Sequence, residues 1–270
     1  MPPIIRSIEL PNYVRLPYAV QGDPAGIPVV FLHGFADSWR SFERVLAYLP
    51  GTIHALALTQ RGHGDASRPA AGYSIRDLAG DLAAFLDALR LPAAVLVGHS
   101  MGSAVAQRFA IDHPARTRGL VLVGASPSLA ASAAARAYWD PILSKLSDPV
   151  EPQLVREMTM GGLARLVPQA FLDANLAESL RVPAHVWRQV FASRWRGEGD
   201  FSGELGRTTA PTLVIWGDQD GRYPRSQQDA LVAAIAGARL VVYAGAGHAL
   251  HWEEPERFAA DVAAFVGGLG

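Results

Sequence analysis

The sequence contains no cysteine, and this absence excludes several kinds of chemistry. Without thiols the chain can form no disulfide scaffold, no four-cysteine zinc site and no covalent intermediate on a cysteine. Lysine is nearly absent too, since Lys145 is the only one and the other basic residues are arginine. The formal net charge is −1, without an acidic or basic tail, so the composition gives no reason to expect nucleic acid or an anionic membrane as a partner.

Long apolar segments are also missing. No stretch approaches the roughly 18 residues that suggest a membrane-spanning helix. Residues 1–6 lack the basic region and apolar run of a secretion signal. Half of the 270 residues are nevertheless hydrophobic and 18% are charged, which favours a folded chain with a sizeable core. Together these features predict a globular, cytoplasmic protein; they say nothing of its oligomeric state.

Short apolar runs alternate with helix-like segments along most of the chain. Their length and continuous hydrophobicity are typical of strands that are buried on both faces of a parallel sheet. We expect such strands at residues 27–32, 53–58, 93–97, 119–123, 212–216 and 239–243. Two earlier segments, 4–10 and 13–21, are joined by a turn and predict an antiparallel start to the sheet. This alternation predicts a right-handed, doubly wound α/β fold.

Segments between these runs have the pattern of amphipathic helices. From residue 74 to residue 89 the apolar side chains recur every three or four positions and share one face. Ser74 and Asp77 at its start form an acidic variant of the capping box. We expect further helices at residues 101–112 and 255–266.

The region from residue 126 to about 207 breaks this rhythm. It has no strand-like run, and its helix-like pieces are separated by glycines and by prolines such as Pro141. It also holds three of the six tryptophans. We interpret residues 126–207 as a helical cap over one end of the sheet, inserted into a core made of residues 1–125 and 208–270.

The strongest chemical signal is the sequence Gly-His-Ser-Met-Gly at residues 98–102. It follows a predicted strand and precedes a predicted helix, which is the context of a nucleophile elbow. Such a turn holds Ser100 in a strained conformation with its hydroxyl clear of the sheet, and Gly98 and Gly102 let neighbouring backbone pass close by. The helix that follows directs N–H groups and its positive dipole end towards developing negative charge.

A serine hydroxyl needs a base, and of the eight histidines His248 is the best candidate. It lies in a glycine-rich loop after the last predicted strand, at the sheet edge where ligands of such folds bind. His251 is the alternative base. The two histidines could also suggest a metal pair, but no further ligand follows at a characteristic spacing, and we expect no metal.

The base in turn needs an acid that holds its tautomer. Asp218 and Asp220 share one loop after the predicted strand at 212–216. We choose Asp220 as the acid and expect Asp218, nearer the strand end, to cap the loop. Backbone donors for an oxyanion are expected from the N–H groups of Phe35, after an early strand, and of Met101.

At this point the sequence resembles the α/β-hydrolase superfamily. The matching motifs are HGF from residue 33, RGHG from 61, GHSMG from 98, GDQD from 217 and GAGH from 245. The resemblance implies a mostly parallel sheet of about eight strands, a helical cap, and a pocket between cap and core. It also implies Ser100 as nucleophile, His248 as general base and then acid, and Asp220 as orienting acid, with no cofactor.

The resemblance leaves the reaction open, because one fold hosts many chemistries. Haloalkane dehalogenases and epoxide hydrolases of this superfamily need an aspartate where this chain has Ser100. We expect a serine hydrolase that cleaves a carboxylic ester or lactone of a small, largely apolar substrate through an acyl-enzyme. Carbon–carbon bond hydrolases acting on diketones share the GHSMG type of elbow and are the alternative, followed by ligand-binding members without activity.

Aromatic residues offer candidates for the substrate pocket. Trp139 and Trp187 come from the expected cap, and Trp39 follows the early strand that supplies the oxyanion loop. Aromatic walls favour an uncharged, apolar acyl or aryl group. We therefore expect these three tryptophans to bind substrate.

Overall fold

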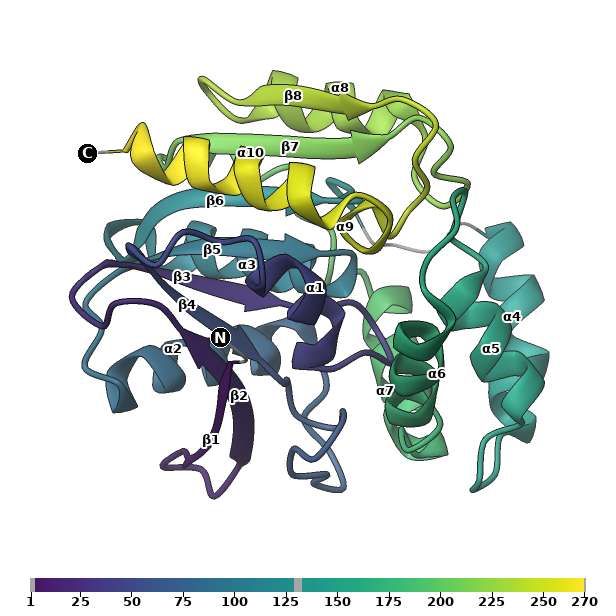
Figure 1. Ribbon diagram of the computed structural model, residues 1–270. Coiled ribbons are helices and arrows are strands. Elements are labelled where there is room, and N and C mark those ends of the chain that lie inside the picture. Colours follow the sequence, from purple (N-terminus) through teal and green to yellow (C-terminus); the bar gives the residue numbers. More distant parts are fainter. Residues whose placement is uncertain (1–2, 129–132, 270) are drawn as a thin grey trace.

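The computed structural model describes residues 3–128 and 133–269, which form one eight-stranded sheet flanked by helices (Figure 1). The strands follow the order β1-β2-β4-β3-β5-β6-β7-β8 across the sheet. Their bounds are β1 Ile4–Glu9, β2 Arg15–Gln21, β3 Ile27–Leu32, β4 Ile53–Leu58, β5 Ala94–His99, β6 Thr117–Val123, β7 Thr212–Gly217 and β8 Arg239–Tyr243. The predicted fold class is confirmed, and every expected strand is present to within a few residues.

Strand direction is mixed only at the N-terminal edge of the sheet. β2 pairs antiparallel with both β1 and β4, whereas the pairs from β4 through β3, β5, β6 and β7 to β8 are parallel. Parallel strands need crossover connections, which the helices supply. The carboxyl ends of the parallel strands therefore meet at one edge, where loops can gather a site.

Helices cover both faces of the sheet. Their bounds are α1 Glu43–Leu46, α2 Ile75–Ala88, α3 Met101–Asp112, α8 Arg225–Ala234, α9 Leu250–Glu253 and α10 Pro255–Gly267. Alternate residues of β3 point to opposite sides: Val30 and Leu32 enter the cluster beneath α2 and α3, and Val29 and Phe31 enter the cluster beneath α1 and α10. Burial on both faces explains the continuous hydrophobicity of the strands.

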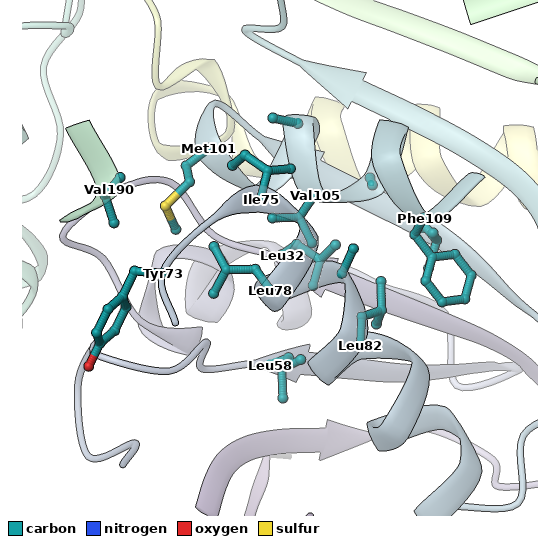
Figure 2. Packing of buried hydrophobic residues seen from close by; sticks show 14 of the residues in the cluster. Leu32, Leu58, Tyr73, Ile75, Leu78, Leu82, Met101, Val105, Phe109 and Val190 are labelled. Atoms are coloured by element: carbon teal, nitrogen blue, oxygen red, sulfur yellow. The ribbon is translucent and has the colours of Figure 1, made fainter. Parts of the chain in front are cut away.

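Figure 2 shows how the first of these clusters extends towards the end of the sheet. Leu78 and Leu82 of α2 meet Val105 of α3 over the strands. The Met101 side chain, at the start of α3, points towards Val190. The core therefore continues without a break into the residues around the elbow.

Four further helices lie together beyond the carboxyl ends of the strands (Figure 1). They are α4 Ala133–Lys145, α5 Pro152–Met160, α6 Gln169–Ser179 and α7 Ala184–Trp195. One expectation for this region is wrong: Pro141 does not separate two pieces but lies inside α4. Among the described residues, no helix is both long and apolar enough to span a membrane.

The N-terminal capping residue of α2, Ser74, allows a test of how much one helix cap contributes to the stability of the fold. Ser74 Oγ accepts a hydrogen bond from Asp77 N at 3.1 Å, and Asp77 Oδ2 accepts one from Ser74 N at 2.9 Å. Ser74→Ala should lower the free energy of unfolding by about 1 kcal/mol, measured by urea denaturation. Ser7→Ala, on the exposed edge strand β1, is the control and should change it by less than about 0.5 kcal/mol. Equal effects of the two substitutions would refute the capping role.

Candidate active site

Ser100 occupies a strained turn between β5 and α3. Its backbone has φ 51° and ψ −113°, a conformation that residues other than glycine rarely adopt. A Cβ at Gly98 would overlap the Gly102 carbonyl oxygen, and one at Gly102 would overlap the Leu32 carbonyl oxygen. Both glycines are therefore needed for β5, α3 and β3 to approach closely enough to form this turn.

The same turn places Ser100 at the N-terminus of α3. Ser100 N donates to the Val123 carbonyl on the neighbouring strand β6 at 3.0 Å, which fixes the turn to the sheet. Met101 is the first residue of the helix, and the first N–H groups of a helix have no partner within it. The arrangement points the positive end of α3 at the space beside the serine.

His248 and Asp220 form a hydrogen-bonded pair. His248 Nδ1 lies 2.8 Å from Asp220 Oδ2, and both residues are buried. The other carboxylate oxygen, Oδ1, accepts the backbone N–H groups of Arg222 at 2.8 Å and Tyr223 at 3.2 Å. Burial alone would raise the pKa of Asp220, but the hydrogen bond and charge of His248, with these backbone donors, hold it below its ordinary value. An ionised Asp220 keeps the proton on Nδ1, so Nε2 is the basic nitrogen of His248.

The two competing residues face elsewhere. Asp218 is exposed, and its Oδ1 accepts the Gly245 N–H at 2.6 Å, so it braces the loop that leads to His248. His251 is buried, with its Nε2 3.1 Å from Ser41 Oγ. Burial lowers the pKa of His251 to about 3, which makes it a neutral packing residue at ordinary pH.

Backbone contacts to the segment after α5 hold the His248 loop. His248 N donates to the Gly162 carbonyl at 2.7 Å, and the His248 carbonyl lies 3.1 Å from His99 Nε2. Glu253 bridges both sides, accepting Gly247 N at 2.9 Å and Ala164 N at 2.7 Å. The position of the imidazole therefore depends on the segment after α5 as well as on the core.

The loop after β3 is shaped by a buried histidine. His33 Nε2 accepts Gln60 N at 3.0 Å, so Nδ1 carries the proton and donates to the Gly34 carbonyl at 2.7 Å. Burial, followed by the neighbouring His63, lowers the pKa of His33 well below its ordinary value, so the ring stays neutral. This brace sets the backbone of Gly34 and Phe35 beside Ser100.

Two adjoining cavities meet at Ser100. The larger, of about 200 Å³, is bounded by Phe35 and Met101 of the core and by Trp139 of α4 and Val190 of α7. The smaller, of about 40 Å³, is lined by Ser100 and His248 together. The structure thus brings the serine, the histidine and both expected oxyanion residues to one connected space.

The three tryptophans divide between two roles. Trp139 lines the larger cavity, as expected. Trp187 is fully buried behind Phe35, with the ring centroids 4.8 Å apart in an edge-to-face arrangement, and Trp39 packs on the cluster of the opposite sheet face. Neither is among the described residues that line the two cavities. We therefore keep only Trp139 as a candidate for substrate contact.

Sequence reasoning missed an acid beside the serine. Asp37 lines the smaller cavity, and its Oδ2 accepts a hydrogen bond from Ser41 Oγ at 3.3 Å. Burial raises the pKa of Asp37 to about 7, although the Ser41 hydrogen bond and the charge of Arg222 lower it. Arg222 lines both cavities and was missed as well. Their only sequence signal is position: Asp37 follows the HGF motif, and Arg222 follows the predicted acid by two residues.

A metal is not suggested by the geometry. His248 and His251, the pair with metal-like spacing, have the separate partners Asp220 and Ser41. Within residues 3–128 and 133–269, no three His, Asp or Glu side chains are grouped so that they could hold one ion.

The raised pKa of Asp37 predicts a pH-dependent stability. The folded protein binds this proton more tightly than the unfolded chain does, so the free energy of unfolding falls as pH rises from about 4 to about 7. Asp37→Asn removes this loss. The difference in unfolding free energy between variant and wild type should therefore grow by up to about 1.4 kcal/mol per pH unit over that window and level off above it.

Denaturation followed by tryptophan fluorescence at a series of pH values measures this difference. The nearby His99, His251 and Arg222 are present in both proteins, so their contributions cancel. Glu9→Gln, which removes an exposed acid on β1, is the control. Parallel pH profiles for Asp37→Asn and wild type would show that the Asp37 carboxyl is ionised like any surface acid.

Comparison with known proteins identifies the family. Residues 29–261 match the family model described as alpha/beta hydrolase family. A 2-hydroxymuconate semialdehyde hydrolase from Pseudomonas sp. strain CF600 is 32% identical over 90% of this chain and 87% of its own length, and a non-heme chloroperoxidase from Streptomyces lividans is 30% identical over 92% and 95%. An esterase from Exiguobacterium antarcticum superposes with a TM-score of 0.87 at 23% identity, covering 97% of this chain and 99% of the esterase. The chain belongs to the alpha/beta hydrolase family.

Proposed function

We propose that the protein is a serine hydrolase that cleaves a carboxylic ester or lactone of a small, largely apolar substrate. The observation that carries this proposal is the hydrogen bond of 2.8 Å between His248 Nδ1 and Asp220 Oδ2. The same histidine lines a cavity together with Ser100, which lies on its strained turn. A base held in one tautomer at the cavity of a serine hydroxyl is the arrangement that acyl transfer requires.

In the proposed first half-reaction, Ser100 Oγ attacks the ester carbonyl carbon while His248 Nε2 takes the hydroxyl proton. The resulting imidazolium is stabilised by the Asp220 carboxylate. The tetrahedral intermediate collapses when His248 gives its proton to the leaving alkoxide, and the acyl group stays on the serine. A water molecule then repeats the sequence, releasing the acid and restoring Ser100.

The negative charge of the tetrahedral intermediate is assigned to the N–H groups of Phe35 and Met101. Support comes from their position, since both residues line the larger cavity with Ser100 and Met101 begins α3. Donors fixed by the fold stabilise the oxyanion without reorganising, which is worth about 10²–10³ in rate per donor.

The pocket walls support a small acyl or aryl group. Trp139, Phe35 and Val190 surround the larger cavity, and its volume of about 200 Å³ leaves room for a few carbon atoms beyond the ester. We assign residues 126–207 as the cap that closes this pocket over a core of residues 1–125 and 208–270. Action in the cytoplasm on a small molecule stays a prediction from the sequence.

Carbon–carbon bond hydrolysis is the second candidate. It is favoured by the 32% identity to the 2-hydroxymuconate semialdehyde hydrolase. Assaying the substrate named for that relative beside p-nitrophenyl esters separates the two reactions. Turnover of the semialdehyde far above that of any ester would replace the ester proposal.

Removing the proposed nucleophile tests the mechanism. Ser100→Ala should lower kcat for p-nitrophenyl butyrate by at least about 10³-fold, because no acyl-enzyme can form. The thermal unfolding midpoint should stay close to that of wild type, and Ser7→Ala should keep full activity. Mass spectrometry after reaction with a fluorophosphonate should find the adduct on Ser100; an adduct elsewhere, or near-normal turnover by Ser100→Ala, would refute the assignment.

The two aspartates of the β7 loop provide a matched pair. Asp220→Asn should lower kcat by about 10⁴-fold, because an amide cannot hold the His248 tautomer or stabilise its charged form. Asp218→Asn keeps an oxygen that can accept the Gly245 N–H, so kcat should change only a few-fold. Steady-state kinetics on both variants decide the point, and the reverse order of effects would move the acid to Asp218.

A further inference from the structure

One residue of the pocket does not suit an uncharged substrate. Arg222 lines both the larger and the smaller cavity, and it carries the only full charge among the described residues that line the larger one. The remaining walls of that cavity are mostly aromatic or aliphatic, including Trp139 and Phe191. A guanidinium that borders an apolar cavity and is also open to solvent can pair with an anion that enters there.

The turn that holds the acid also positions Arg222. Its backbone N–H donates to Asp220 Oδ1 at 2.8 Å, so the residue is anchored two positions after the acid. A Cβ built on Gly162 would lie 2.9 Å from His248 Cβ and 3.4 Å from Arg222 Nε. The guanidinium and the imidazole therefore border the same glycine, and the arginine stands at the edge of the reaction site.

The side chain is oriented by the cap. Arg222 Nη2 donates to the Met158 carbonyl at 2.6 Å, and Nη1 lies 3.2 Å from Met158 Sδ. A thioether is a weak acceptor, which a carboxylate oxygen would replace with a large gain. Because Arg222 is exposed as well as cavity-lining, it lies where the pocket opens to solvent, and an anion can reach it.

A buried acid lies near this charge. Asp37 lines the smaller cavity with Arg222, but burial raises the pKa of Asp37 to about 7 even with the opposing influence of the guanidinium. Burial therefore favours the protonated form of Asp37, in which this acid carries no charge. Burial lowers the pKa of His99, and the charge of Arg222 acts in the same direction.

We propose that Arg222 is a specificity-determining residue that binds a carboxylate of the substrate, so that the preferred ester is a small one with an apolar body and one free carboxylate. The inference rests on the proposed ester hydrolysis and goes beyond it by specifying that the substrate is negatively charged. A planar guanidinium can hold a carboxylate through two parallel hydrogen bonds, which fixes the ester relative to Ser100.

Isosteric ester pairs test the proposal. Mono-p-nitrophenyl glutarate and p-nitrophenyl valerate differ in a carboxylate on the acyl side, and 4-acetoxybenzoate and its methyl ester differ on the alcohol side. The measured quantity is the ratio of kcat/KM for the anionic ester to that for the neutral ester. In at least one pair, Arg222→Met should lower this ratio by about tenfold or more, mainly through KM.

Two further variants separate recognition from structure. Arg222→Lys keeps the positive charge but not the two parallel donors of the guanidinium, so it should lower this kcat/KM ratio less than Arg222→Met does. Arg156→Met removes an exposed arginine on α5 that lines neither cavity, and should leave the ratio unchanged. If Arg222 served only to hold the cap through Met158, both esters of a pair would slow equally and the ratio would stay constant, which would overturn the proposal.

A binding measurement keeps the result independent of turnover. Calorimetric titration of Ser100→Ala with monomethyl glutarate and with methyl valerate should show tighter binding of the anion, and this preference should vanish in the Ser100→Ala, Arg222→Met double variant. No preference for the anion in Ser100→Ala would overturn the carboxylate site. Absence of turnover by wild type with every ester, together with a clear anion preference here, would reject the ester reaction and leave the carboxylate site standing.

Discussion

The close approach of three backbone segments is the constraint on which the site depends. β3, β5 and α3 meet at Gly98 and Gly102, where a Cβ would overlap a carbonyl oxygen of another segment. That approach forces Ser100 into its positive-φ conformation and fixes it to β6 through one backbone hydrogen bond. The strain, of order 1–3 kcal/mol, is sustained because the sheet is buried on both faces and cannot relax around the turn.

The other half of the site is supported by two parts of the chain. Asp220 is fixed by β7 and its turn, whereas the His248 backbone is bound to Gly162 and the loop around it is bridged to Ala164 by Glu253. A movement of the segment after α5 would carry the imidazole with it. The alignment of the imidazole with Ser100 therefore depends on this segment as well as on the sheet.

The sequence contained most of the fold because the fold rests on local patterns. Buried parallel strands need continuous apolar runs, and α2 and α3 have caps or motifs at their starts, so their bounds could be predicted to within one residue. α8 was not predicted, because this surface helix buries few side chains and its apolar pattern is weak. Pro141 was taken as a break between helices, because nothing in the neighbouring sequence indicates that a proline lies inside α4. The roles proposed for the serine, aspartate and histidine followed from motifs. The packing roles of Trp39 and Trp187 did not, because only tertiary contacts decide which aromatic faces a cavity.

Charge around Ser100 sets a further condition on the chemistry. Asp37 lines the cavity that Ser100 and His248 share. An ionised Asp37 would stabilise the imidazolium of His248, but it would destabilise an oxyanion held by the loop after β3. Burial favours the protonated form of this acid, and the guanidinium of Arg222 favours the ionised form. An anionic substrate that pairs with Arg222 would remove the second influence and shift Asp37 towards its neutral state. Substrate charge would then position the ester and also reduce the negative charge of Asp37, which weakens both its opposition to the oxyanion and its support of the imidazolium.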